Sequence, residues 1–319
     1  MRREFVFTAV TLVAVLAALS FVYPIALWGF AIVGPLVAAG TWDLLQTRHA
    51  IRRNFPLIGN FRYLFEAVRP EINQYFVESN TDGMPFNRDH RSLVYQRSKR
   101  EPDTVPFGTK LDVYQVGYEW LNHSLAPKHV DPKELRVTIG GSQCAKPYSA
   151  SILNISAMSF GSLSKNAILA LNAGAKKGGF AHDTGEGGLS PYHLEPGGDL
   201  IWEIGTGYFS ARTLDGKFSP ERFAENAQRP EVKMCELKLS QGAKPGHGGI
   251  LPAAKLTAEI ARIRGVEMGK DVLSPPAHTA FSTPIGLCEL LGKMRELSGG
   301  KPVGFKLCLG HPWELMGIV

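Results

Sequence analysis

An unbroken apolar segment near the start of the chain is its clearest pattern. From Phe5 to Trp42 the sequence contains no Asp, Glu, Lys or Arg, a run of 38 residues. Because one membrane-spanning helix needs about 20 apolar residues, this run is close to two spans in length. Tyr23-Pro24 lies near its middle, where proline favours a reversal over one continuous helix. The pattern therefore predicts two helices, over Phe5–Val22 and Ile25–Thr41.

Basic residues flank this segment on both sides. Arg2 and Arg3 precede it, and Arg48, Arg52 and Arg53 follow it. Since positive residues next to a span favour the cytoplasmic side, residues 1–42 are predicted to form a transmembrane hairpin in the inner membrane, with the remaining body in the cytoplasm. The alternative is a cleaved signal peptide. That segment would have an apolar core of only about 7–15 residues and a small-residue cleavage site, and none follows Leu19.

Residues 43–136 have a different character, being polar, basic and only weakly periodic. Prolines interrupt the segment repeatedly, and the part from Phe55 to Tyr75 is rich in aromatic residues. We interpret it as a juxtamembrane segment that wraps a larger domain.

From residue 137 to 319 the chain alternates short apolar segments with capped helical segments, and 27 of its 34 glycines lie from Gly140 onward. This alternation predicts a parallel sheet and the α/β class, to which doubly wound sheets and (β/α)₈ barrels both belong. The strands are expected at Leu153–Phe160, Gly179–Thr184, Lys233–Ser240 and Val303–Leu309. The helices are expected at about Ser162–Lys177, Ser219–Gln228, Ala253–Arg264 and Thr283–Leu297.

Glycine-rich loops follow the predicted strands and favour the barrel. They include Ser159–Gly161, Thr184–Gly188 and Gln241–Gly249. In a (β/α)₈ barrel such loops form the catalytic face, where glycine lets the backbone approach a ligand closely. No G-x-G-x-x-G fingerprint of a dinucleotide-binding fold and no Walker A sequence occurs.

Charge and cysteine content narrow the function classes. The net charge is +6, of which residues 43–100 contribute +4, from ten Lys/Arg against six Asp/Glu. The excess of positive charge thus lies beside the apolar segment. This location favours a membrane as the partner over nucleic acid. The four cysteines, Cys144, Cys235, Cys288 and Cys308, are far apart and form no C-x-x-C pair. We assign them no metal or redox role.

Four sequence blocks resemble a known family. These are Ser156–Ser164 (SAMSFGSLS), Thr184–Gly188 (TGEGG), Gln241–Gly249 (QGAKPGHGG) and Ser274–Pro276 (SPP). In this order they resemble the FMN-binding synthase domain of glutamate synthase, and with the apolar hairpin its stand-alone, membrane-anchored branch. An acidic residue often stands at the position of His247 in the large glutamate synthase chain.

The resemblance implies a (β/α)₈ barrel in which reduced FMN passes hydride to 2-iminoglutarate, formed from 2-oxoglutarate and ammonia. The nitrogen would come from ammonia or glutamine, and the electron donor is unknown. The backbone of Ala157, Met158 and Ser159 would lie against the flavin ring, and Gln241 would contact the flavin edge or the substrate. Lys306 would lie near flavin N1, where reduced flavin carries negative charge.

The dicarboxylate substrate requires cations, and Lys238, Lys244 and Lys255 surround the loop after the third predicted strand. Glu186, the one acid in its glycine loop, is expected to handle the imine proton, with Glu186 and Lys306 as the catalytic residues. Glu186 could instead cap its own loop, and Lys255 could be a solvated surface lysine. His182 and His247 have no second ligand at a suitable spacing, so no metal site is expected.

The family's iron–sulfur cysteine cluster and a glutamine-hydrolysing domain are absent from the sequence. Four strands are predicted where a closed barrel needs eight, so we expect the chain to be the N-terminal part of the barrel, truncated before its C-terminal half. Two alternatives remain. One is another FMN barrel oxidoreductase acting on a small carboxylate or amine. The other is an inactive membrane-anchored remnant, or one whose barrel a partner completes.

Overall fold

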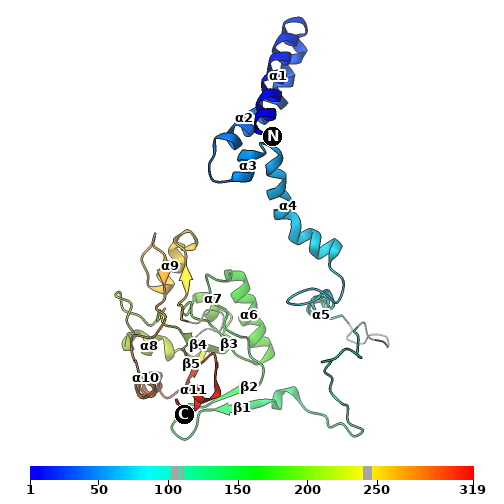
Figure 1. Cartoon of the computed structure of the whole chain (residues 1–319). Helices are drawn as coiled ribbons and strands as arrows, with labels where there is room; N and C mark the ends of the chain where they lie inside the picture. The colour runs from blue at the N-terminus through cyan, green and yellow to red at the C-terminus, as the bar shows by residue number, and fades with distance from the viewer. Residues whose placement is uncertain (102–107, 109–110, 240–245) are drawn as a thin grey trace. The chain divides into compact units, whose positions relative to one another are not determined.

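The structure is a computed structural model that describes residues 1–101, 108, 111–239 and 246–319. It divides into two compact units, Met1–His123 and Ser124–Val319. In Figure 1 the first unit runs from blue through cyan into dark green, and the second continues to red at the C-terminus.

The first unit begins with two helical stretches, Arg2–Val22 and Pro24–Leu45, each long and apolar enough to cross a membrane. They comprise α1 (Arg2–Val22) and α2 (Phe30–Leu45), joined by the short helix η1 (Pro24–Gly29). Between α1 and η1 lies Tyr23 in an extended conformation, with φ −128° and ψ 96°. The reversal therefore falls at the Tyr23-Pro24 pair, as the sequence predicts.

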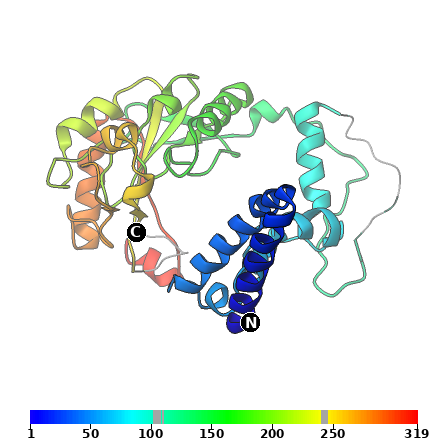
Figure 2. The same ribbon diagram turned by 90° about the horizontal axis from the view of Figure 1, so that it is seen from above.

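Small residues let α1 and α2 pack closely as an antiparallel pair (Figure 2). The ring of Phe5 lies against Gly40, so close that a Cβ on that glycine would come within 2.1 Å of a ring carbon. At the other end, a Cβ on Gly29 would lie 2.7 Å from the side chain of Leu16. Phe5 lies near the start of α1 and Gly40 near the end of α2. The start of the hairpin therefore lies next to its end.

The segment that the sequence shows as only weakly periodic contains further helices. The C-cap residue Arg100 of the last one adopts the left-handed conformation at φ 59°. The elements are α3 (Ala50–Asn54), α4 (Ile58–Ile72), η2 (Asn73–Val77) and α5 (Arg88–Lys99).

The second unit is a mixed α/β fold around a parallel sheet with strand order β3-β4-β5-β8 (Figure 1). Two small antiparallel pairs, β1-β2 and β6-β7, accompany it. The strands are β1 (Arg136–Ile139), β2 (Tyr148–Ser151), β3 (His182–Asp183), β4 (Leu200–Ile204), β5 (Val232–Lys238), β6 (Ile250–Leu251), β7 (Val272–Leu273) and β8 (Val303–Lys306).

Helices follow the strands of the sheet, and the first residues of two predicted helical segments are their N-caps. The hydroxyl of Ser219 accepts a hydrogen bond from the Arg222 N–H, and that of Thr283 accepts one from the Gly286 N–H. The helices are η3 (Pro132–Glu134), α6 (Lys165–Gly178), α7 (Pro191–Leu194), α8 (Pro220–Ala227), η4 (Ala253–Lys255), α9 (Ala258–Arg264), α10 (Pro284–Leu297) and α11 (Pro312–Met316).

The core lies between the sheet and α8 and α10. Trp202 of β4 is fully buried and stacks on Phe223 of α8, with ring centroids 5.3 Å apart. Leu237 of β5 and Met294 of α10 are also fully buried in the same apolar cluster. This packing holds the strands rigidly, and with them the side chains that project from their carboxyl ends.

The two small antiparallel pairs were not predicted, and the parallel sheet differs from the prediction in two strands. The strand expected at Leu153–Phe160 is reduced to isolated bridges, of which the one between Ile155 and His182 joins it to β3. Strand β4 was not predicted, because the buried Glu203 interrupts its apolar pattern. In the sheet, β4 lies between β3 and β5.

Candidate active site

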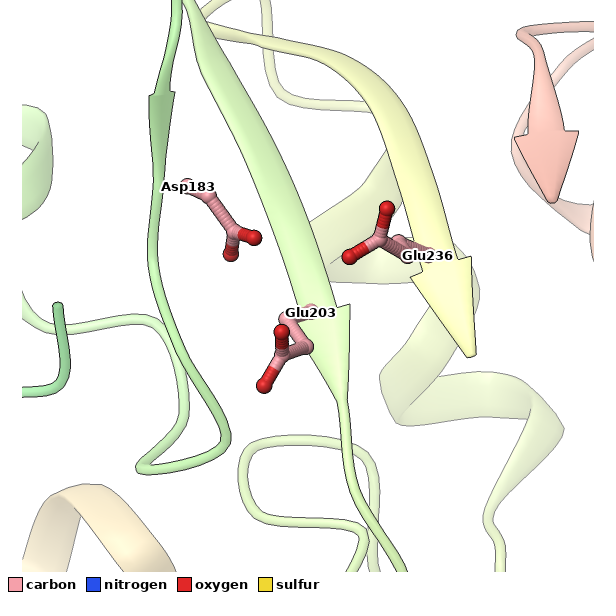
Figure 3. Close-up of side chains that lie close together, drawn as sticks. All are labelled: Asp183, Glu203 and Glu236. Atoms are coloured by element: carbon pink, nitrogen blue, oxygen red, sulfur yellow. The ribbon is translucent and has the colours of Figure 1, made fainter. Parts of the chain in front are cut away.

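Charged side chains from four neighbouring strands meet at the carboxyl end of the sheet. Strand register explains why they do. Glu203 of β4 lies opposite Glu236 of β5, and two residues further along Lys238 of β5 lies opposite Lys306 of β8. Since residues i and i+2 share a face of a strand, these groups project to the same side. The carboxyl of Asp183, from β3, completes a group of three acids (Figure 3).

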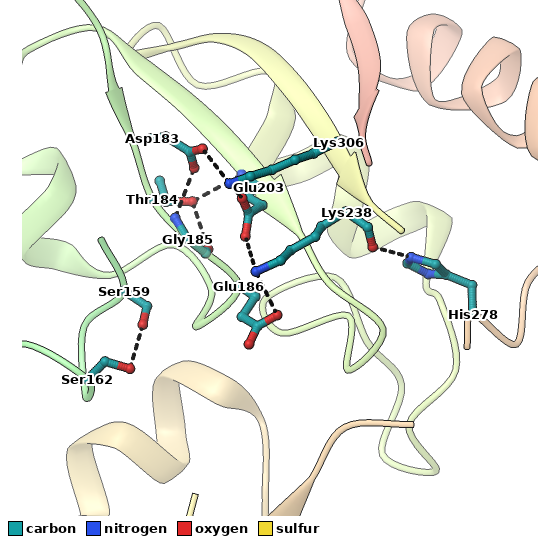
Figure 4. Close-up of polar contacts among 10 residues, drawn as sticks. All are labelled: Ser159, Ser162, Asp183, Thr184, Gly185, Glu186, Glu203, Lys238, His278 and Lys306. Atoms are coloured by element: carbon teal, nitrogen blue, oxygen red, sulfur yellow. Dashed lines mark hydrogen bonds and ion pairs between the residues drawn. The ribbon is translucent and has the colours of Figure 1, made fainter. Parts of the chain in front are cut away.

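Glu203 is the centre of the charged group. Its side chain is fully buried, and its Oε2 accepts a hydrogen bond from Lys306 Nζ at 2.6 Å. Its Oε1 lies 3.4 Å from Lys238 Nζ, which also lies 3.3 Å from Oε2 of Glu186 (Figure 4). The resulting chain Glu186–Lys238–Glu203–Lys306 is called the charge relay below, and it links the glycine loop after β3 to the edge strand β8.

Burial shifts the pKa values of the remaining acids. Burial, with the charge of Glu203 second, raises the pKa of Asp183 to about 8, although its Oδ1 accepts a hydrogen bond from the Gly185 N–H at 3.0 Å. Burial also raises the pKa of Glu236. Burial alone would lower the pKa of Lys306, but its hydrogen bond to Glu203 and the nearby carboxylates outweigh that effect and raise it. Burial thus favours the neutral carboxyl of Asp183, beside the ammonium group of Lys306.

A backbone surface lies beside the charge relay. The glycine loop after β3 packs on Ser159, and a Cβ on Gly185 would lie 2.9 Å from the Ser159 N. Met158 is held at both ends: its N–H donates to the Asp183 carbonyl at 3.1 Å, and its carbonyl lies 3.0 Å from Nε2 of the buried His193. The segment 157–159 is therefore fixed in position next to the loop that carries Glu186.

Comparison with known proteins places this arrangement in a family. The family model described as "Conserved region in glutamate synthase" matches residues 114–319. The chain belongs to the glutamate synthase family. The match includes every strand of the parallel sheet and all the residues of the charge relay.

Three individual proteins that are similar to the chain also carry glutamate synthase in their names. The chain is 36% identical over 315 residues to the glutamate synthase large subunit-like protein YerD of Bacillus subtilis, covering 86% of this chain and 59% of that protein. It is 36% identical over 158 residues to the archaeal-type glutamate synthase [NADPH] of Thermotoga sp., covering 49% of this chain and 28% of that protein. It is 33% identical over 152 residues to the glutamate synthase [NADPH] large chain of Azospirillum brasilense, covering 47% and 9%. The chain thus spans less than two thirds of the length of each of these relatives.

Within this glutamate synthase fold, the structure brings together some of the residues singled out from the sequence. Glu186, Lys238 and Lys306 join in the charge relay, and Ala157, Met158 and Ser159 lie beside the Glu186 loop. Lys255 is exposed on η4, and its side chain makes no ion pair or hydrogen bond among the described residues. Gln241 and Lys244 lie outside the described residues.

Sequence reasoning missed the acids and histidines that support the site. Asp183, Glu203 and Glu236 each stand in an apolar strand, where a charged residue signals a buried partner. The same signal applies to Lys306, whose partner is Glu203. The buried His278 lies 2.7 Å from the Lys238 carbonyl and 3.0 Å from the Tyr208 hydroxyl, so it fixes the end of β5.

The three strand carboxyls lie close enough together to suit a metal ion, with oxygens within 4.8 Å of one another. The two lysines already bring positive charge to this group, since Lys306 binds Glu203 and lies 3.8 Å from Asp183. We therefore interpret the group as a buried ion-pair network and assign no metal to it.

Proposed function

We propose that this protein is a glutamate synthase-type FMN oxidoreductase that converts 2-oxoglutarate and ammonia to glutamate by reductive amination through 2-iminoglutarate. The observation that carries the proposal is the charge relay, which sets a partly exposed glutamate and two lysines beside a fixed backbone surface in a member of the glutamate synthase family. Nitrogen could reach the site as ammonia or from glutamine, and the electron donor is a separate partner.

The described residues fit the ring side of a flavin site. A flavin ring is flat and has a polar edge of N–H and C=O groups, so it needs a close backbone surface with free donors and acceptors. Among the described residues, the backbone groups of Ala157 and the N–H of Ser159 make no hydrogen bond within the chain. Lys306 is about one third exposed and could place its charge near the flavin N1. When bound, reduced FMN would supply the hydride.

The residues of the relay are suited to the substrate. An imine carbon accepts hydride more readily once its nitrogen is protonated, so a group that can pass a proton is needed nearby. Glu186 is 29% exposed and is the member of the relay on a loop, so a bound substrate could reach it. Lys238 places positive charge between Glu186 and Glu203, where it would also attract a substrate carboxylate.

Replacing Glu186 by Gln should leave flavin bound and slow glutamate formation by about 10²- to 10⁴-fold, because the amide cannot pass a proton. Glutamate formation from 2-oxoglutarate and ammonium, and flavin content from visible absorbance, would be measured in the protein carrying this sequence. Glu225→Gln, on the exposed face of α8, is the matched control. Unchanged turnover in Glu186→Gln, or turnover with a different 2-oxo acid or amine only, would overturn the proposal.

We also propose that α1 to α2 anchor the protein in the inner membrane, with both ends and the α/β unit in the cytoplasm. The close packing of Phe5 on Gly40 supports a hairpin, and the apolar side chains around it are mostly exposed. Arginines stand at both ends of the hairpin, and Arg2 Nε donates to the Arg53 carbonyl at 3.0 Å.

Reporter fusions test this orientation. Fusions at Arg3 and at Arg53 should both report the cytoplasm, since the two positions lie at the same end of the hairpin. A fusion at Trp28, beside the reversal, should report the opposite side and serves as the control. A periplasmic signal at either arginine would contradict the hairpin.

A further inference from the structure

Helix α4 carries an apolar stripe that none of the described residues of its own unit covers. Phe61, Leu64, Phe65, Val68 and Ile72 recur at the three- and four-residue spacing that aligns side chains on one helix face. All five are exposed, with Phe61 at 56% and Phe65 at 62% of their full accessible area. A stripe of large apolar side chains this exposed marks a surface that binds something.

The start of α4 is fixed to the end of the hairpin. The buried carboxylate of Asp43, in the last turn of α2, accepts hydrogen bonds from the Leu57 N–H at 3.0 Å and from Asn60 Nδ2 at 2.6 Å. A Cβ on Gly59 would lie 3.0 Å from the Cα of Arg52, so α3 and α4 are in contact there. If the hairpin crosses the membrane, α4 must therefore begin where its two ends leave the bilayer.

The charge of this region fits the surface of such a bilayer. Residues 43–77 contain five arginines against three acids. Arg62 and Arg69 each follow a stripe residue directly, so they lie at the border of the apolar face. A helix with an apolar face bordered by arginine is suited to the boundary between acyl chains and anionic headgroups.

We propose that α4 lies in the cytoplasmic interface of an anionic phospholipid bilayer, with its apolar stripe in the acyl boundary and Arg62 and Arg69 at the headgroups. This inference rests on the proposed membrane anchor. The α/β unit and a second copy of the chain are the other possible covers of the stripe, and the fixed start of α4 at the hairpin end favours lipid over both.

The test uses the full chain in vesicles of phosphatidylcholine and phosphatidylglycerol. A genetically encoded fluorescent amino acid replaces Phe65 on the stripe, Ala67 on the opposite face of the same helix, or Leu12 in the middle of α1. Quenching by iodide reports water, and quenching by phospholipids with nitroxides at shallow or deep positions reports lipid. The probe at Phe65 should be quenched by shallow nitroxides and shielded from iodide, whereas the probe at Ala67 should show the reverse.

The Leu12 probe separates the two proposals. If deep nitroxides quench it while iodide quenches the Phe65 probe, the anchor stands and the inference about α4 is wrong. If neither quencher reaches Phe65, protein covers the stripe, and the inference is again wrong. If iodide quenches the Leu12 probe, the anchor fails and the inference fails with it.

Discussion

Replacing Lys306 by Met is expected to lower the free energy of unfolding of the α/β unit by about 3 kcal/mol, the lower end of the range for breaking a buried ion pair. The lower end applies because one third of the Lys306 side chain is exposed, whereas the Glu203 carboxylate that it binds at 2.6 Å is fully buried. Denaturant unfolding measures the loss. Lys177→Met, at an exposed position of α6, should change stability by less than about 0.5 kcal/mol.

A second substitution separates the effect of Lys306 on stability, through its ion pair with Glu203, from its proposed effect on the flavin. In the double variant Lys306→Met with Glu203→Gln, no buried charge is left without its ammonium, so most of the lost stability should return. Flavin should still bind more weakly, or have a lower reduction potential, because the cation proposed to lie near N1 is missing. Full flavin content and an unchanged potential in the double variant would show that Lys306 acts only on the fold.

Replacing Asp183 by Asn should change how stability depends on pH. The pKa of Asp183 is raised from 3.8 to about 8 by burial and by the charge of Glu203. Above about pH 4 the unfolded chain releases this proton while the folded protein keeps it, so the wild-type protein loses stability as the pH rises toward 8. The slope from one such group is at most about 1.4 kcal/mol per pH unit. The amide of the Asp183→Asn variant has no such proton to lose, and its oxygen can still accept from Gly185.

The measurement is the melting temperature of both proteins between pH 5 and pH 8. The melting temperature of the variant, relative to that of the wild-type protein, should increase steadily as the pH rises. This increase should level off near the raised pKa of Asp183. Glu225→Gln, which removes an exposed carboxylate, should give a curve parallel to that of the wild-type protein. A parallel curve for Asp183→Asn would mean that this carboxyl is ionised in the folded protein throughout the range.

The sequence predicted the ends of several helices in the α/β unit because their determinants are local. Proline after Ser219 and after Thr283 marks the first turns of α8 and α10, and both hydroxyls cap as expected. The Gly178-Gly179 end of α6 was equally readable, since Gly179 adopts the left-handed conformation at φ 69°. Strand β4 was missed because a strand interrupted by a buried acid is recognisable only when the acid's partner is known.

The candidate site, too, could be predicted from the sequence only in part. Lys306 could be singled out, because a lysine in an apolar strand requires an anion nearby. Which anion it meets depends on the pairing of β8 with β5 and of β5 with β4, three segments separated by long stretches of sequence. The same reasoning applied to Glu203 and Asp183 would have predicted buried acids in need of a cation, but it could not have named the lysine that supplies it.

The charge relay also bears on how faithfully the chain folds. Strands β8 and β5 pair although they are far apart in the sequence, since Cys235 lies opposite Val303. Because side chains alternate along a strand, a slip of one residue moves every side chain of β8 to the other face of the sheet. A slip of β8 by one residue would bring Phe305 or Leu307 to the place of Lys306 and leave Glu203 buried without its closest cation. The ion pair thus disfavours misaligned arrangements of β8 on β5.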